Sequence, residues 1–186
     1  MTRHDSASWE HLRLKDRIRP GVRVLFVGIN PGVRSAQTGH HFAGYSNRFW
    51  KLLWDAGLVP EPITFQDDDR LPEFGYGITN LVARPTPGID TLLPSEYVEG
   101  WKVLDRKIRK FKPSVAALVG VTLWRAILPL LKVDDEHRAR LKRSPVPGPQ
   151  PLTLHGAAVH VLPNPSGRNA NFSYTEMLEA FRRLQA

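Results

Sequence analysis

Residues 24–32 read Val-Leu-Phe-Val-Gly-Ile-Asn-Pro-Gly, an apolar run that stops at a glycine and continues into a turn. Pro31 and Gly32 are turn-forming residues, and Asn30 is the one polar side chain in this stretch. The pattern predicts a buried strand that delivers Asn30 to the carboxyl end of a sheet, which is the edge where open α/β sheets bind their ligands.

A second asparagine lies between prolines after another apolar run, in Val-His-Val-Leu-Pro-Asn-Pro-Ser-Gly at residues 159–167. Two strands that end in similar loops predict one site built from two segments that are distant in the sequence. Asn30 and Asn164 are therefore the first candidates for functional side chains.

The rest of the chain alternates between predicted strands and predicted helices. Apolar runs predict core strands at residues 22–28, 77–82, 115–120 and 159–162, with residues 152–154 a candidate for pairing beside the last one. Apolar spacings of three and four predict helices at 46–57, 95–111, 121–131 and 173–185, whereas 58–75 and 132–150 are predicted to be loop and connector. Pro129 is expected to kink or end its helix. This alternation predicts an α/β fold with a mainly parallel sheet between helices.

Charge points toward one class of partner. The chain has 186 residues, enough for one domain with a substantial core, and lysine and arginine outnumber the acids 26 to 18, for a net charge of +8. The excess favours a polyanionic partner such as nucleic acid. The alternative is a basic surface that serves only solubility.

Composition excludes several other classes. The sequence contains no cysteine, so disulfides, cysteine-ligated zinc and iron–sulfur clusters are excluded. No run approaches the roughly 18 apolar residues of a membrane span, so we expect no membrane partner. Residues 1–16 lack the apolar stretch of a signal peptide, and we expect a cytoplasmic protein.

The turn around Asn30 limits its chemistry. Gly28-Ile-Asn-Pro-Gly32 matches neither a dinucleotide-binding nor a P-loop pattern, and Pro31 lacks the N–H that a phosphate cradle would use, so we expect no nucleotide cofactor. A carboxamide takes up no proton near neutral pH, so Asn30 could position a water or bond a base edge. The alternative is that Asn30 only closes the turn.

Phe42 ends the same loop, in Gly-His-His-Phe-Ala-Gly, where its ring could stack on a base or anchor the loop in the core. The two adjacent histidines before it are poorly placed to share one ion. The acidic runs at 67–69 and 134–136 could hold magnesium, but such runs are more typical of solvated loops or helix caps. The sequence therefore predicts no metal site.

The loop Asn164-Pro-Ser-Gly-Arg168 combines small turn residues with one long cation. Ser166 and the backbone amides could grip a phosphate, while Arg168 could enter a groove of nucleic acid. The alternative is a plain surface turn before the last helix, with Ser173 as the N-cap of that helix.

With Asn47-Arg-Phe-Trp50 and Gly77-Ile-Thr-Asn-Leu-Val-Ala-Arg-Pro-Thr86, these motifs resemble the mismatch-specific uracil/thymine-DNA glycosylases of the uracil-DNA glycosylase superfamily. The resemblance spans residues 22–184. It implies a three-layer α/β/α sandwich around a four-stranded parallel sheet. It also implies that the N-glycosidic bond of a flipped uracil opposite guanine, with thymine as a further candidate, is hydrolysed without metal or cofactor.

Carried over by motif, the resemblance makes Asn30 the residue that positions water, Phe42 the ring that stacks on the base and Asn164 the group facing the leaving base. The implied base pocket comprises Gly28, Ile29, Gly32, Ser35, Phe42 and Asn80, and the implied DNA-binding loop comprises Ser166, Gly167, Arg168 and Asn171. Arg168 replaces a typical leucine of the bacterial mismatch enzymes. Arg168 and Asn80 both match the thymine-directed branch, so uracil and thymine both stay open.

We therefore expect a monomeric, monofunctional DNA glycosylase that initiates base excision repair on double-stranded DNA with a damaged or mismatched base. Residues 1–186 are expected to form a single domain of this type, with 1–20 as an N-terminal extension. One competing interpretation is a non-catalytic nucleic-acid-binding α/β module, in which Asn30 and Phe42 only read a base. Another is a metal-dependent nuclease that uses the acidic loops.

Overall fold

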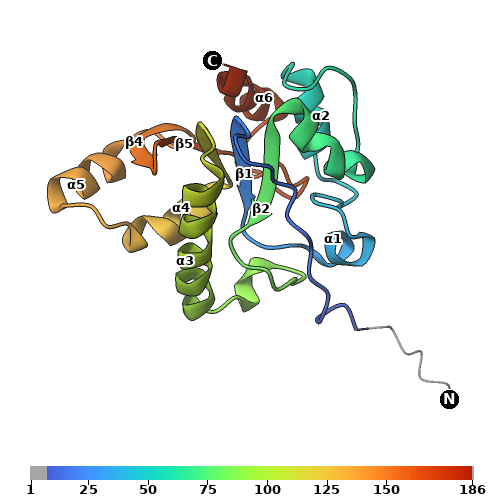
Figure 1. Cartoon of the computed structure of the whole chain (residues 1–186), viewed down its shortest axis with the longest axis horizontal. Helices are drawn as coiled ribbons and strands as arrows, with labels where there is room; N and C mark the ends of the chain where they lie inside the picture. The colour runs from blue at the N-terminus through green and yellow to red at the C-terminus, as the bar shows by residue number, and fades with distance from the viewer. Residues whose placement is uncertain (1–7, 186) are drawn as a thin grey trace.

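The computed structural model describes residues 8–185, and its centre is a five-stranded sheet in the order β2-β1-β3-β5-β4 (Figure 1). The strands are β1 (Val24–Gly28), β2 (Tyr76–Asn80), β3 (Val115–Val119), β4 (Gly148–Leu154) and β5 (Ala157–Leu162). β1 pairs in parallel with β2 and β3, β3 pairs in parallel with β5, and β4 runs antiparallel to β5. The predicted α/β fold with a mainly parallel sheet is confirmed.

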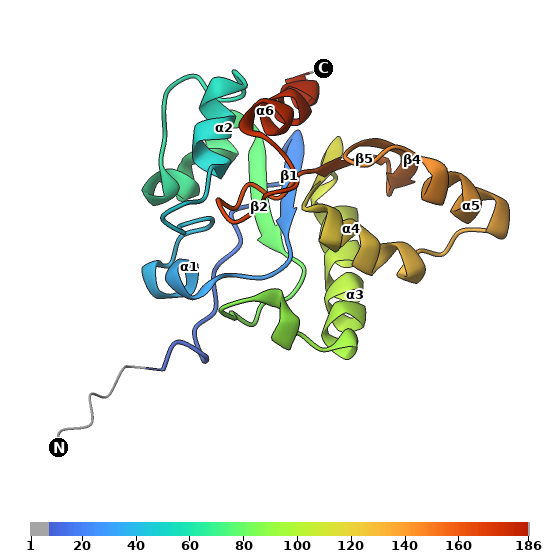
Figure 2. The same cartoon turned by 180° about the vertical axis from the view of Figure 1, so that it is seen from behind.

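Helices cover both faces of the sheet, which gives three layers (Figures 1 and 2). They are α1 (Val33–Thr38), α2 (Phe49–Asp55), α3 (Pro94–Phe111), α4 (Val121–Ile127), α5 (Asp135–Arg143) and α6 (Tyr174–Arg182). Side chains alternate along the fully buried β1, so Val24 and Phe26 pack with α2 and α6, whereas Leu25 and Val27 pack with α3 and α4. The central strand therefore reads as one continuous apolar run because both of its faces are covered.

The predicted core of four strands is corrected to five. The additional strand, β4, contains Pro149 and Pro151, and it lies at the edge of the sheet. Sheets tolerate proline at an edge, because one side of the strand carries no ladder hydrogen bonds. The pairing considered for residues 152–154 is observed, and it extends back to Gly148 opposite Val161.

The prediction of a connector at residues 132–150 is wrong, because this segment contains α5 and the start of β4. Leu141 is the buried residue of α5, and the rest of the helix is largely charged, so it has little apolar periodicity to detect. Its first turn is held by Asp134, whose side chain accepts a hydrogen bond from the backbone N–H of His137 at 2.7 Å.

The prediction of loop at residues 58–75 is also wrong in part. A 3-10 helix spans Phe65–Phe74 and begins in a capping box formed by Thr64 and Asp67. Local capping, rather than an apolar stripe, therefore organises the acidic run in this segment.

Local sequence signals predict the observed ends of two helices to within a few residues. α2 begins after Arg48, two residues later than the predicted N-cap Ser46. The expected break at Pro129 is confirmed, because α4 ends at Ile127 and a 3-10 turn follows it. The long loop after β1, predicted without secondary structure, contains the short helix α1.

Residues 8–20 of the predicted N-terminal extension reach the edge of the sheet at β2. The backbone N–H of Arg17 donates to the carbonyl of Ile78 at 3.0 Å, and the N–H of Ile78 donates back to Arg17 at 2.8 Å. Residues 1–7 of the extension lie outside the described residues. The assignment of the whole chain to a single domain stays a prediction. Among residues 8–185, no helix combines the length and the apolar character that crossing a membrane requires.

The carboxyl ends of β1, β2 and β5 lie at one edge of the sheet. Gly28 at the end of β1 is in register with Asn80 at the end of β2, and Val119 of β3 is in register with Leu162 of β5. The loops that follow these strands therefore leave from the same edge, as the sequence predicted.

Candidate active site

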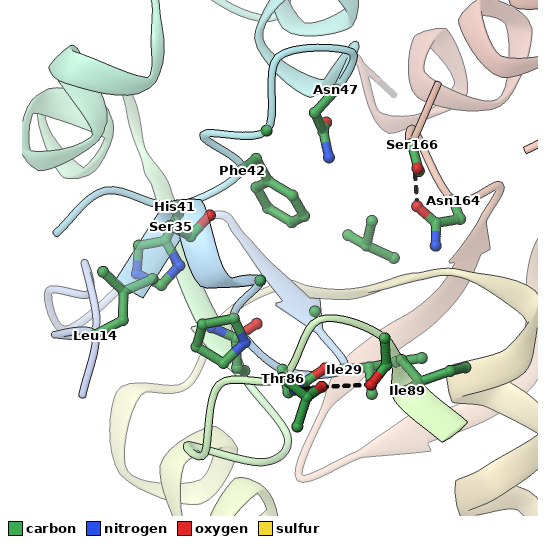
Figure 3. A pocket seen from close by; sticks show the side chains of 18 of the residues that line it. Leu14, Ile29, Ser35, His41, Phe42, Asn47, Thr86, Ile89, Asn164 and Ser166 are labelled. Carbon is green, nitrogen blue, oxygen red and sulfur yellow. Dashed lines mark hydrogen bonds between the residues drawn. The ribbon is translucent and has the colours of Figure 1, made fainter. Parts of the chain in front are cut away.

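A cavity of about 250 Å³ opens at this edge, between the loops that follow β1, β2 and β5 (Figure 3). The predicted site residues that line it are Gly28, Ile29, Asn30, Gly32, Ser35, Phe42, Asn80, Asn164 and Ser166. Gly167, Arg168 and Asn171 lie outside this cavity. The structure thus brings together Asn30 and Asn164, which are far apart in the sequence.

The side chain of Asn30 is held in one orientation. Its Nδ2 donates to the backbone carbonyl of Arg84 at 2.9 Å and to Thr86 Oγ1 at 2.7 Å. Thr86 in turn donates its hydroxyl hydrogen to the carbonyl of Gly88 at 2.6 Å (Figure 3). Because a carbonyl only accepts and the Thr86 hydrogen is already used, the Asn30 nitrogen must face this loop. The other polar atom of the amide, Asn30 Oδ1, is therefore left to accept a hydrogen bond.

The loop that holds Asn30 is itself fixed by an ion pair. Arg84 Nε donates to Glu96 Oε1 at 2.7 Å, and Arg84 Nη2 donates to Glu96 Oε2 at 2.9 Å and to the carbonyl of Thr91 at 3.1 Å. The Arg84 hydrogen bonds, with one from the backbone N–H of Leu93, lower the pKa of Glu96 to about 2. The Arg84 carbonyl is thus presented to Asn30 by a restrained backbone.

Phe42 packs against the core, as one of its two predicted roles requires, and it also borders the cavity. Its stacking on a base stays a prediction. Its ring stacks on Phe49 with centroids 4.1 Å apart and planes inclined by 22°. The residue is half-buried, and Figure 3 shows its ring directed toward the space between Asn47 and Asn164. Its backbone φ of 51° lies in the left-handed region, an unusual conformation for a bulky residue that other contacts must hold.

Asp68 supplies the main contacts that hold this loop. Its carboxylate is fully buried, and its Oδ2 accepts a hydrogen bond from the backbone N–H of His41 at 2.8 Å. Its Oδ1 lies 2.8 Å from His40 Nδ1 and 3.3 Å from Arg17 Nε. The indole N–H of Trp50 donates to the His41 carbonyl at 3.1 Å. One member of the acidic run at 67–69 is therefore a structural anchor, a role that sequence reasoning missed.

His41 is the titratable residue that lines the cavity among the described residues. Its Nε2 lies 2.8 Å from the carbonyl of Lys15, so Nε2 carries the hydrogen. Burial lowers the pKa of His41 below its usual 6.5, against the opposing effect of that hydrogen bond. His41 is therefore neutral at physiological pH. No aspartate or glutamate of the described chain lines the cavity.

Close approach explains the glycine that ends β1. A Cβ at Gly28 would lie 2.5 Å from Asn80 Oδ1 and 3.6 Å from the Phe42 ring, so a side chain here would displace Asn80. The nearby Ser35 is buried, and its Oγ accepts a hydrogen bond from the backbone N–H of Ala43 at 3.1 Å. Ser35 therefore supports the Phe42 loop as well as lining the cavity.

Asn164 lies on the opposite side of the cavity from Asn30. It uses its amide oxygen, rather than its amide nitrogen, to bond the protein. Its Oδ1 accepts a hydrogen bond from the backbone N–H of Ser166 at 3.0 Å (Figure 3). Its backbone carbonyl accepts another from Asn169 Nδ2 at 2.9 Å. The oxygen of this exposed amide is thus used inside its own loop, and Nδ2 is left as a donor.

The predicted DNA-binding loop is pressed against the loop that carries Phe42. A Cβ at Gly167 would lie 2.4 Å from Ser46 Cβ, so this contact requires glycine. The exposed Arg168 borders a separate groove of about 250 Å³, together with Asn164, Ser166 and Asn171. Arg168 and Asn171 therefore lie beside the cavity that holds Asn30 rather than in it.

The acidic runs provide no metal centre within residues 8–185, where no group of three or more histidine, aspartate or glutamate side chains is placed to hold an ion. Asp67 and Asp134 cap helices, and Asp68 anchors the Phe42 loop. These observations favour the capping interpretation of the acidic runs over the nuclease.

Residues 16–185 match the family model of the Uracil DNA glycosylase superfamily. The chain belongs to this superfamily. The fold agrees with the match, because the chain superimposes with a TM-score of 0.62 on the solution NMR structure of a protein from Methanosarcina acetivorans described as a candidate uracil DNA glycosylase. That alignment covers 94% of this chain and 98% of the other at 18% identity. The superfamily makes this protein a DNA glycosylase, a hydrolase of N-glycosyl bonds whose substrate is DNA.

Proposed function

We propose that this DNA glycosylase is monofunctional and hydrolyses the N-glycosidic bond of uracil mispaired with guanine in double-stranded DNA, with thymine as a second candidate base. The observation that carries the proposal is the fixed Asn30 amide in a cavity that no described carboxylate lines. Such a cavity positions a water without a strong general base. The released base leaves an abasic site, which would initiate base excision repair.

The cavity walls suit a base turned out of the helix. Its volume of about 250 Å³ leaves room for one base, which must leave the stack before its glycosidic bond can be reached. The base would stack on Phe42, whose ring is supported from behind by Phe49. Asn30 Oδ1 would accept a hydrogen bond from the attacking water, and Asn164 Nδ2 would donate one to an oxygen of the base.

The bond changes follow from these positions. The water oxygen bonds to the sugar C1′ while the bond from C1′ to the base nitrogen breaks, and the electron pair of that bond leaves with the base as an anion. The added water then loses one proton, which passes through solvent to the base anion, so the products are the neutral free base and the C1′ hydroxyl of the abasic site. A donor such as Asn164 Nδ2 stabilises charge that develops on that base. Without a carboxylate base, the rate depends on this stabilisation and on water placement, so we expect a slow enzyme that favours weakly paired bases.

The loop of Ser166, Gly167 and Arg168 would occupy the gap that the flipped nucleotide leaves. Arg168 is exposed and long enough to reach the orphaned guanine or a neighbouring phosphate, and Asn171 borders the same groove. Side chains inserted into a duplex in this way stabilise the distorted DNA. We propose that the protein acts as a monomer on such duplexes.

The test is release of free uracil from a G·U duplex, compared with thymine from G·T and with uracil opposite adenine. Asn30→Ala should lose most of the release while it still binds the duplex. The matched control is Asn47→Ala, a second asparagine of the cavity wall whose Oδ1 accepts a hydrogen bond from the backbone N–H of Phe49 at the start of α2. Binding without release by the unmodified protein on every duplex would favour a non-catalytic module instead.

A further inference from the structure

Tyr45 is the most exposed large hydrophobic side chain of the described residues, at 90% of its full accessible surface. Single exposed apolar residues are common on protein surfaces and need no explanation by themselves. Tyr45 differs because its loop forms part of the cavity mouth. The same loop meets Gly167 through Ser46, and the backbone N–H of Arg48 donates to the Pro165 carbonyl at 2.9 Å.

Arg34 holds the Tyr45 ring in place. The guanidinium carbon of Arg34 lies 3.7 Å from the Tyr45 ring centroid, which is within the range of a cation–π interaction. Arg34 Nε donates to the carbonyl of Ala43 at 2.6 Å, which fixes the guanidinium of this α1 residue against the loop that carries Tyr45. Neither Nη of Arg34 has a hydrogen-bond partner among the described residues. One side of the ring is thus covered by a cation, and the rest faces solvent.

A second cavity, of about 370 Å³, lies beside this pair, and we call it the Tyr45 cavity. Its aromatic walls are Phe42, Tyr45, Trp50 and Phe65. It shares Phe42, Gly44 and Asn47 with the cavity that holds Asn30, which we call the base cavity, so the two are neighbours. Aromatic rings beside a cation are the surface on which nucleobases stack without regard to sequence.

The walls of the Tyr45 cavity are fixed independently of any ligand. Trp50 is bonded through its indole N–H to the His41 carbonyl, and Phe65 lies 5.4 Å from the Arg34 guanidinium carbon. Lys51 also lines the cavity, but its ammonium is paired with Asp55 at 2.6 Å. Arg34 therefore supplies the charge that is available to a phosphate.

We propose that the Tyr45 cavity binds the unpaired base next to the flipped one, so that the protein engages two successive bases of a single strand. A neighbour inside a duplex is paired and stacked, whereas in single-stranded DNA it is free to turn toward Tyr45. The Arg34 Nη atoms would contact the phosphate between the two bases. The proposal rests on the proposed function only for the identity of the first base.

The test measures binding, so it does not depend on turnover. A labelled single-stranded oligonucleotide carries one 2′-fluorinated deoxyuridine, because the fluorine makes the glycosidic bond resistant to hydrolysis. Two further probes replace the base on its 5′ or its 3′ side with an abasic analogue, and a fourth is the same oligonucleotide in a G·U duplex. Each probe is titrated by fluorescence anisotropy against the unmodified protein, Tyr45→Ala and Tyr45→Phe.

A stacked base contributes about 1–3 kcal/mol, so Tyr45→Ala should raise Kd for the intact single strand by about 5- to 150-fold. Tyr45→Phe, which keeps the ring, should stay within about twofold. The loss caused by Tyr45→Ala should vanish on one of the two abasic probes and should be under about twofold on the duplex.

Three results would overturn the proposal: no loss on the intact single strand, an equal loss on both abasic probes, or an equal loss on the duplex. Unfolding midpoints of the three proteins should agree, because Tyr45 is exposed. Uracil release from the G·U duplex is measured separately. Absent release with the expected Tyr45 pattern would refute the proposed function alone, and the reverse result would refute the Tyr45 cavity alone.

Discussion

Replacement of Asn30 by aspartate tests the orientation of its amide directly. Asn30→Asp is nearly isosteric, but an oxygen then faces the Arg84 carbonyl and Thr86 Oγ1, where the amide nitrogen donates at 2.9 and 2.7 Å. The Arg84 carbonyl cannot donate. Thr86 can donate to the new carboxylate only by giving up its bond to the Gly88 carbonyl. The substitution therefore removes two hydrogen bonds and places like partial charges together.

The loss of folding stability in Asn30→Asp is set by those two hydrogen bonds. A hydrogen bond of this kind contributes about 1–1.5 kcal/mol net. With its carboxylate ionised, Asn30→Asp should therefore have a free energy of unfolding about 2–3 kcal/mol below that of the unmodified protein. Protonation returns one donor and should recover about half of the loss. The substituted carboxyl therefore has a folded pKa above its unfolded value of about 3.9.

The stability deficit of Asn30→Asp should grow with pH. A folded state that binds the proton more tightly is favoured at low pH, so the deficit should be smallest below about pH 4 and should grow as pH rises through the folded pKa. Urea unfolding of Asn30→Asp, Asn30→Ala and the unmodified protein at pH 4 and pH 8 measures it. A deficit that is absent at pH 8, or equal at both pH values, would refute the assigned amide orientation.

The pKa of about 2 at Glu96 means that its pair with Arg84 stabilises the fold fully above about pH 4.5 and progressively less as pH falls through 2. Because the pair is partly exposed, Glu96→Gln should lower the free energy of unfolding by about 1 kcal/mol or less at pH 7 and by clearly less at pH 2, as measured by urea unfolding. Chelators should leave uracil release unchanged, and activity that is lost in EDTA and restored by magnesium or zinc would reveal a metal site. Arg168→Ala should weaken binding to a G·U duplex by about 1–3 kcal/mol and to single-stranded uracil DNA by less, measured by titration at two salt concentrations. Equal losses on matched and mismatched duplexes would reduce Arg168 to a phosphate contact.

The elements that sequence reasoning found are those with an apolar signature. β1 is buried on both faces, so its composition alone locates it and the turn that presents Asn30. β4 was missed as a full strand because its prolines are permitted only by its place at the edge, which the sequence does not reveal. α5 was missed because a charged helix with Leu141 as its buried residue has no apolar stripe.

The functional residues divide in a similar way. Asn30 and Asn164 carry a local signal, since each is the one asparagine at which an apolar run gives way to turn-forming residues. Asp68 and Thr86 act through hydrogen bonds to residues 27 and 56 positions away, and no local pattern announces such a bond. Motif context could have suggested Thr86, because it ends the segment that follows β2. Tyr45 becomes notable only through its exposure beside a second cavity.

The two asparagines of the base cavity have opposite polarity, and that arrangement bears on mechanism. Asn30 uses its nitrogen on the protein and offers an oxygen, which suits a water that must donate a hydrogen. Asn164 uses its oxygen within its loop and offers a nitrogen, which suits a base that leaves with negative charge. Neither group gains or loses a proton in this scheme, so no side chain has to be poised near neutral pH.

We expect the rate of uracil release to be nearly independent of pH above neutrality. His41 is the titratable side chain that lines the cavity among the described residues, and burial lowers its pKa below 6.5, so its neutral form predominates above that pH. The single-turnover rate of uracil release with saturating protein should therefore be nearly flat from about pH 7.5 to pH 8.5, because His41 is already mostly neutral there. A tenfold rise per pH unit in that interval would show a titrating general base and would contradict catalysis by fixed amides alone. Unfolding and duplex binding of the unmodified protein, measured over the same range, control for pH effects on folding and on DNA binding.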